Sequence, residues 1–178
     1  MESVVQQQKT AFSSLKSELG YTNPMQTPRV EKVVISVGVG STKDKNKIAL
    51  VVDRLGKITG QKPAPRGAKK SVAAFKTRQG DVVGYLVTLR GRRATSFLDK
   101  LFLTALPRTR DFRGIGRAGV DAMGNYTLGI REHAIFPETS DEELRDVFGM
   151  AVTIVTTGGS AKDAVRFFEH IGLPFTRS

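Results

Sequence analysis

Residues 71–89 read SVAAFKTRQGDVVGYLVTL, and this stretch decides the predicted fold. Residues 82–89 are rich in β-branched and aromatic side chains, as strands are. Residues 71–77 can pair with them across the turn Arg78-Gln79-Gly80-Asp81. A tight hairpin joins antiparallel strands, so the centre of the chain is expected to be an antiparallel sheet.

Helices and strands alternate on both sides of this hairpin. Apolar residues at helical spacing predict helices over 4–19, 48–58, 94–105 and 161–171, and a shorter acidic helix is expected at 141–148. Predicted helix boundaries are marked by Gly20, Gly60, Pro107, and Ser160 with Asp163. β-branched runs predict strands at 29–39, 126–131 and 150–157. Pro63 and Pro65 predict an irregular loop that continues through Lys70.

Together these elements predict an α+β fold, with a largely antiparallel sheet, helices packed on one face and long basic loops. The whole chain, 1–178, is expected to form one domain. Its parts are the N-terminal helix 4–19, a basic region 57–117 and a C-terminal α/β portion 125–178.

The net charge of +11 is concentrated in one part of the chain. Residues 57–117 hold fifteen Lys and Arg against three Asp, a net charge of +12. Such a concentration repels itself unless a polyanion compensates it. Arg dominates the second half of this region, and its planar guanidinium suits phosphate. A surface that merely keeps the chain soluble is the weaker interpretation.

Two tracts carry this charge, residues 66–78 and residues 108–114. In the first, Phe75 and Thr77 alternate with Lys76 and Arg78, so the two pairs would face opposite sides of a strand. Phe75 is equally compatible with packing in the core and with stacking on a base. In the second tract, Asp111 is expected to pair with a neighbouring Arg. Residues 108–124 are expected to form a long loop, ordered by itself or by RNA.

Other chemistry has little support in the sequence. Gly38-Val39-Gly40 lies between a strand and a helix, but Lys43 stands where a dinucleotide fingerprint needs a third glycine, and no P-loop occurs. The two histidines, His133 and His170, are far apart. The carboxylates of 138–143 cluster at an expected helix start, which they would stabilise. An enzyme is therefore not expected, nor a cofactor or metal.

The composition also bounds the location and the partner. The chain has no cysteine, no apolar run of membrane length and no secretory signal at its start, so a cytoplasmic protein without membrane contact is expected. No zinc finger, basic zipper or recognition helix for duplex DNA is evident. Basic loops and glycine-rich turns on a sheet suit an irregular folded RNA better.

The sequence resembles the L5 (uL5) family of bacterial large-subunit ribosomal proteins. The matching segments occur in order along nearly the whole chain: residues 25–32, 59–63, 68–73, 75–76, 87–91, 106–108, 110–114, 124–126, 135–138, 153–157 and 174–175. The resemblance implies a non-enzymatic component of the central protuberance of the large subunit. Its partners would be 5S ribosomal RNA, the large ribosomal RNA, peptidyl-site transfer RNA and neighbouring ribosomal proteins, including one in the head of the small subunit.

The resemblance also assigns roles to residues. Contacts with 5S ribosomal RNA would come from Gln61, Phe75 and Thr88, and from Ser36, where the family usually has a longer Asn. The basic tracts would add RNA contacts from Lys69, Lys70, Lys76, Arg90, Arg108, Arg110 and Arg113. The loop of Arg78, Gln79 and Gly80 would reach the transfer RNA. Met123 stands where relatives commonly have Arg, which removes a phosphate contact there.

Overall fold

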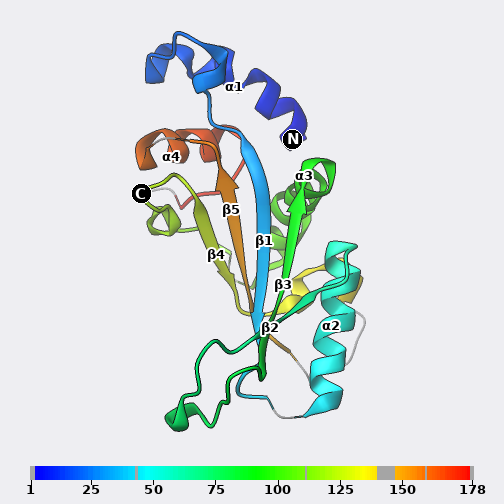
Figure 1. Cartoon of the computed structure of the whole chain (residues 1–178). Coiled ribbons are helices and arrows are strands. Elements are labelled where there is room, and N and C mark those ends of the chain that lie inside the picture. The colour runs from blue at the N-terminus through cyan, green and yellow to red at the C-terminus, as the bar shows by residue number, and fades with distance from the viewer. Residues whose placement is uncertain (1–2, 43, 111, 140–146, 159, 177–178) are drawn as a thin grey trace. The chain divides into compact units, whose positions relative to one another are not determined.

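The computed structural model describes residues 3–42, 44–110, 112–139, 147–158 and 160–176. Within these ranges the chain forms a five-stranded antiparallel sheet and four α-helices, which confirms the α+β prediction (Figure 1). The helices are α1 (Val4–Leu19), α2 (Lys45–Thr59), α3 (Gly91–Lys100) and α4 (Ala161–His170). The strands are β1 (Val30–Gly38), β2 (Ala64–Gly67), β3 (Val82–Arg90), β4 (Tyr126–Ile130) and β5 (Met150–Thr156).

The strands lie in the order β2-β3-β1-β5-β4. The chain divides into two compact units, and the four longer strands each contribute residues to both. The first unit contains Met1–Val33, Leu89–Leu128 and Thr153–Ser178, and the second contains Val34–Thr88 and Gly129–Val152. The predicted RNA-binding residues are therefore distributed between two units.

The predicted helix ends are confirmed at three helices. Gly20 and Gly60 adopt left-handed conformations after α1 and α2, with φ of 69° and 66°. The hydroxyl of Ser160 accepts the backbone N–H of Asp163 at 3.1 Å and caps α4. Pro107 does not end the third helix, because α3 continues through a π turn into a 3-10 turn, Leu106–Arg108, that contains it. Proline is tolerated in the first turn of a helix, where its missing N–H would have no partner anyway.

The core lies on one side of each long strand. Alternate residues of β1, namely Val33, Ile35 and Val37, are buried, and Val87 and Leu89 of β3 are also buried. The intervening side chains of both strands are half-buried or exposed. A half-covered antiparallel sheet is expected to show this alternation. The side chains between the buried ones, including those of Ser36 and Thr88, therefore lie on the open face.

The predicted position of the first hairpin strand is wrong. Residues 71–77 form no strand, and β3 pairs instead with β2, so that Ala64 faces Leu86 and Pro65 faces Tyr85. The prolines were expected to forbid regular structure there. However, β2 is an edge strand, and an edge strand tolerates proline because one of its sides needs no hydrogen bonds. The hairpin is real, but a long loop replaces its predicted tight turn.

The predicted acidic helix at 141–148 lies outside the described residues except for its last two, which are not helical. The other predicted strands are confirmed within a residue or two as β1, β4 and β5. Shorter helical turns occupy Pro24–Gln26, Ala73–Phe75, Arg117–Gly119, His133–Ile135 and Pro137–Thr139.

Candidate nucleic-acid interface

The segment between β2 and β3, residues 68–81, is a folded loop. In Figure 1 it extends as two nearly parallel runs of chain with a short helical turn at the tip. At its base, the N–H of Ala68 donates to the carbonyl of Asp81 at 2.8 Å, and the N–H of Gly80 donates back at 3.0 Å. Nearer the tip, Val72 and Thr77 exchange two more backbone bonds. We call this segment the β2–β3 loop.

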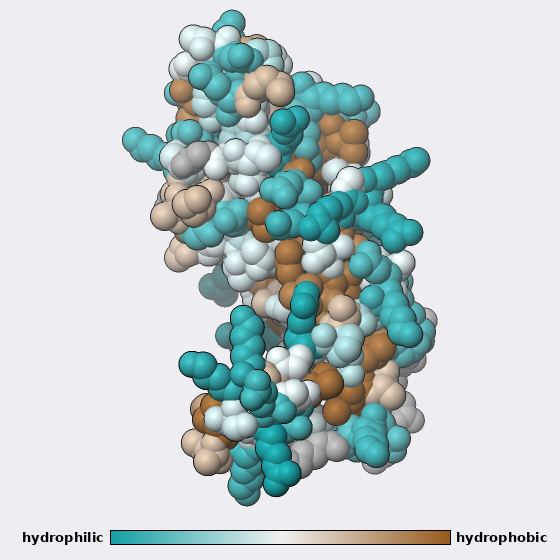
Figure 2. Space-filling model, in the orientation of Figure 1, coloured by the Kyte–Doolittle hydropathy of each residue, from teal (hydrophilic) through white to brown (hydrophobic). Residues whose placement is uncertain are grey.

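The tip of the β2–β3 loop exposes an aromatic ring among cations. Phe75 is 78% exposed, so the structure excludes packing in the core and leaves the ring free to stack on a base. Lys69, Lys70, Lys76 and Arg78 are exposed in the same loop. Where Figure 1 places this loop, Figure 2 shows long hydrophilic side chains around a few hydrophobic atoms. This combination is typical of surfaces that bind single-stranded or looped nucleic acid.

Lys76 has an unusual backbone conformation. Its φ is 49°, which makes it the one non-glycine residue with positive φ in the part of the chain that the structure describes. Its N–H donates to the carbonyl of Ala73 at 3.0 Å and closes the turn at the tip. The sequence favoured an extended strand here, and no local pattern indicated this turn.

Three further predicted residues of the second unit lie beside the sheet or on it. Ser36 of β1 and Thr88 of β3 are half-buried, and they occupy the face opposite Ile35 and Val87. Gln61 follows the Gly60 cap of α2, and its N–H donates to the Thr59 hydroxyl at 3.3 Å. Ser36 and Thr88 therefore present hydroxyl groups on the open face of two neighbouring strands.

The remaining predicted residues belong to the first unit. Arg90 ends β3, and Arg108, Arg110 and Arg113 lie in the segment after the third helix; all four are exposed. The predicted pairing of Asp111 lies outside the described residues. The predicted set is thus divided into the β2–β3 loop, the open strand face and Gln61 in one unit, and four arginines in the other.

The segment after these arginines is ordered by contacts with the C-terminal residues. The N–H of Ile115 donates to the carbonyl of Pro174 at 2.8 Å, and Thr176 donates to Ile115 at 3.0 Å. Gly114 has a φ of +98°, and a Cβ there would lie 2.7 Å from the nitrogen of Thr176. This part of the predicted loop is therefore packed against the C-terminal residues.

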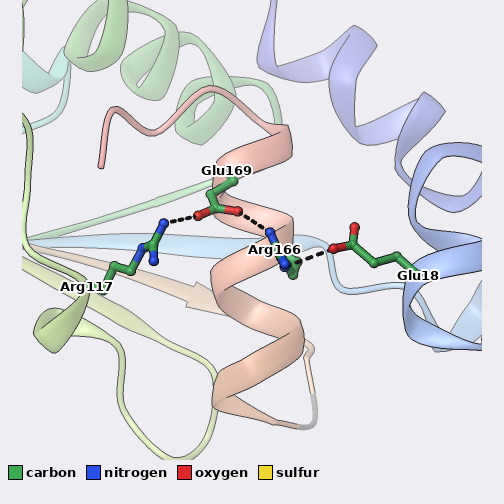
Figure 3. A network of polar contacts seen from close by, with 4 residues as sticks. All are labelled: Glu18, Arg117, Arg166 and Glu169. Carbon is green, nitrogen blue, oxygen red and sulfur yellow. Dashed lines mark hydrogen bonds and ion pairs between the residues drawn. The ribbon is translucent and has the colours of Figure 1, made fainter. Parts of the chain in front are cut away.

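Arg117 is engaged in an ion-pair network, shown in Figure 3. Its guanidinium lies 2.8 Å from the carboxylate of Glu169, which also binds Arg166 at 3.1 Å. Arg166 contacts Glu18 of α1 at 3.0 Å. The network joins the segment after the third helix to α4 and α1. Arg117 is one of the fifteen Lys and Arg residues counted in 57–117, and its charge is paired within the protein.

The turn at 121–125 is held by one carboxylate. Asp121 accepts N–H groups of Met123 at 3.0 Å and Asn125 at 2.7 Å, and the Asn125 amide at 2.9 Å. The hydrogen bond from the Asn125 side chain is the main cause of the lowered pKa of Asp121. Met123 lies on this turn with its side chain 72% exposed, and because it carries no charge it cannot form an ion pair with a phosphate.

The Gly38-Val39-Gly40 turn has no phosphate cradle. Val39 is buried, and its N–H donates to the carbonyl of Val83 at 2.9 Å. The N-terminus of α2 is capped by Asp44, whose carboxylate accepts the N–H of Asn46 at 2.9 Å. A carboxylate at this position repels a phosphate from the helix end that nucleotide sites use.

Neither histidine is placed as a catalytic base. His133 is 2% exposed, lies 2.8 Å from the guanidinium of buried Arg54 and stacks on Phe148 with ring centroids 4.2 Å apart. Because a guanidinium only donates, the facing imidazole nitrogen accepts. His170 contacts the carbonyl of Gln7 at 2.8 Å and joins α4 to α1. Both histidines pack elements together.

Among the described residues, no group of three or more His, Asp or Glu could hold a metal ion. No helix among those residues is both long and apolar enough to cross a bilayer.

Comparison with known proteins gives the family. Residues 23–78 match the family described as Ribosomal protein L5, and residues 82–175 match the model of the C-terminus of the same ribosomal family. A protein of Anaeromyxobacter sp. (strain Fw109-5), named large ribosomal subunit protein uL5, is 45% identical over 94% of both chains. Proteins of the same name in Flavobacterium johnsoniae and Natranaerobius thermophilus are 49% and 47% identical, over 94% and 91% of this chain and 92% and 91% of theirs.

These matches define the class as a structural ribosomal protein rather than an enzyme. The chain belongs to the L5 (uL5) family, whose members are proteins of the large ribosomal subunit. Its location is accordingly the ribosome in the cytoplasm.

Proposed function

We infer that this protein binds 5S ribosomal RNA in the large ribosomal subunit, that it also contacts the large ribosomal RNA, and that its β2–β3 loop reaches the peptidyl-site transfer RNA. A protein in the head of the small subunit is a further proposed neighbour. The exposure of Phe75 among four cations is the observation that carries this proposal. A ring that is 78% exposed contributes little to folding and is accessible for stacking on a base.

The second unit supports the contact with 5S ribosomal RNA. Ser36 and Thr88 place hydroxyl groups on the open strand face, and hydroxyl groups can donate to or accept from bases and the ribose 2′-OH. Gln61 adds an amide that can pair with a base edge. Ser36 is shorter than the Asn usual in the family and lacks the separate donor and acceptor of an amide, so it cannot reproduce a paired amide contact with a base.

The first unit supports contact with RNA backbone. Arg90, Arg108, Arg110 and Arg113 are exposed, and guanidinium groups bind phosphate through paired hydrogen bonds. Three of them precede the segment that Ile115 ties to the C-terminal residues. An ordered attachment lowers the entropy lost when these side chains bind.

Sedimentation of lysate with tagged protein tests the assembly, because the tag should travel with large subunits. Filter binding then tests the RNA, with labelled 5S ribosomal RNA competed by duplex DNA at matched salt. We expect 5S ribosomal RNA to compete far better than duplex DNA. If duplex DNA competes as well as 5S ribosomal RNA, the protein has only a general affinity for polyanions, and the proposal is contradicted.

A further inference from the structure

Two side chains of the β2–β3 loop hold the backbone of neighbouring residues. The hydroxyl of Ser71 accepts the N–H of Gln79 at 2.9 Å. The carboxylate of Asp81 accepts the N–H of Arg78 at 2.7 Å. Arg78 and Gln79 are two of the residues proposed to reach the transfer RNA, whereas Ser71 and Asp81 have so far had no role.

These two bonds lie between the backbone pairs of the loop. Toward the tip, the last pair joins Val72 to Thr77, and at the base Ala68 pairs with Gly80 and Asp81. Residues 78 and 79 fall between them, and the side chains of Ser71 and Asp81 satisfy their N–H groups. The loop is thus tied along its whole length rather than only at its ends.

The charge of Asp81 makes its position informative. It is the one acidic residue in 57–98, a stretch otherwise rich in Lys and Arg. A carboxylate beside four exposed cations lowers the attraction of the loop for phosphate. The charge of Asp81 therefore does not favour RNA binding, and we look for its role in the hydrogen bond that it accepts from the N–H of Arg78.

We propose that Ser71 and Asp81 are positioning residues, which set the conformation of residues 78–80 before an RNA partner arrives. This inference rests on the proposed contact of the loop with transfer RNA. Preorganisation lowers the entropy lost on binding, and it favours the bound conformation without any new contact with the partner.

The first arm of the test needs no RNA. Amide hydrogen exchange of the free full-length protein reports the N–H groups of Arg78 and Gln79. We expect protection in the wild type, loss at Arg78 in Asp81→Ala and loss at Gln79 in Ser71→Ala. Asp81→Asn and Ser71→Thr keep an acceptor oxygen and should retain protection. Unprotected amides in the wild-type protein would overturn the proposal.

The second arm measures transfer RNA retained in the peptidyl site of large subunits that lack this protein and are supplied with each variant. Loss of one positioning hydrogen bond should lower retention about fivefold in Ser71→Ala and Asp81→Ala. Asp81→Asn, which removes the charge and keeps the acceptor, should equal or exceed the wild type. Asp53→Ala is the matched charge control, because Asp53 pairs with Lys57 on α2, outside the loop.

The sign of the Asp81→Ala effect decides the question. If the carboxylate only opposes phosphate, Asp81→Ala retains as much transfer RNA as Asp53→Ala or more, and the positioning role is refuted. Reduced retention in Asp81→Ala with normal retention in Asp81→Asn supports it. Arg78→Ala separates the two proposals: wild-type retention in that variant contradicts the transfer RNA contact itself, while the exchange arm still decides whether Ser71 and Asp81 hold the loop.

Discussion

Gly84 of β3 lies against the carbonyl of Val37 of β1 so closely that a Cβ on Gly84 would be 2.8 Å from the oxygen. Real Cβ atoms do not approach backbone oxygens that closely, so neighbouring strands come together here only because Gly84 has no side chain. The open face that carries Ser36 and Thr88 depends on this contact between their two strands.

Gly84→Ala should therefore destabilise the fold by about 2 kcal/mol, since the backbone of β1 or β3 must shift. Urea unfolding followed by circular dichroism measures the change. Gly40→Ala is the matched control: its Cβ would lie 3.6 Å from the nearest atom, an ordinary contact with Val83. Equal stability of the two variants would contradict the steric explanation.

Phe75→Ala should weaken binding of 5S ribosomal RNA and leave folding unchanged. Stacking of a base on an aromatic ring contributes about 1–3 kcal/mol, which corresponds to a loss of at least about fivefold in affinity. Filter binding at fixed salt gives the affinity, and thermal unfolding gives the stability. Met25→Ala removes another side chain of similar exposure, 74%, and should change neither quantity. Unaltered affinity in Phe75→Ala would remove the ring from the interface.

Binding of 5S ribosomal RNA should depend steeply on salt. If about six Lys and Arg side chains neutralise phosphates, the logarithm of the affinity falls with the logarithm of the salt concentration at a slope near about −4 to −5. Filter binding over a range of potassium chloride concentrations measures this slope. A slope near zero is incompatible with a charge-driven interface.

Arg78→Ala should separate the two RNA partners. Arg78 is assigned to the transfer RNA, whereas Phe75 of the same loop is assigned to 5S ribosomal RNA, so affinity for 5S ribosomal RNA should remain within about twofold, as expected for one exposed charge. Retention of transfer RNA on assembled ribosomes should fall. Loss of 5S ribosomal RNA binding in this variant would show that the loop has been assigned to the wrong partner.

Alkaline pH should destabilise the protein through two tyrosine hydroxyls, those of half-buried Tyr21 and buried Tyr126. Burial raises the pKa of Tyr126 to about 12, and burial together with the charge and hydrogen bond of Asp163 raises the pKa of Tyr21 to about 12. Both values exceed the ordinary 10.0, so this stability is fully present below pH 10 and is lost as the pH rises toward 12.

Tyr126→Phe should remove part of this alkaline loss and leave the part due to Tyr21. At neutral pH it should lower stability by about 1 kcal/mol, because the hydroxyl of Tyr126 donates to the carbonyl of Gly116 at 3.0 Å. Urea unfolding of both proteins at neutral pH and at pH 11 gives the comparison. An identical pH dependence of the variant and the wild type would contradict the role of Tyr126.

Local patterns predicted most of the secondary structure. The glycines after α1 and α2 and the serine before α4 end or begin helices through bonds with residues only a few positions away, so they could be recognised from the sequence. β2 was missed because its prolines argue against a strand, and only its position at the sheet edge makes them acceptable. That position depends on the order of all five strands.

In the candidate site, too, features that depend on nearby residues could be predicted, and features that depend on distant residues could not. The concentration of charge identified the basic region, but not which of its bases are compensated. Arg117 pairs with Glu169, more than fifty residues later in the chain, and no local pattern reveals such a pair. Phe75 could be assigned to core or surface only from the structure, because the loop around it is held by bonds across its own two sides.

Pro65 also bears on how the protein behaves before it is assembled. β2 is at the edge of the sheet, where an unpaired strand can recruit a strand from another molecule and start aggregation. The strand has four residues, one of them a proline that offers no N–H and another a charged arginine. The residues that seemed to break the strand thus discourage self-association through this edge of the sheet.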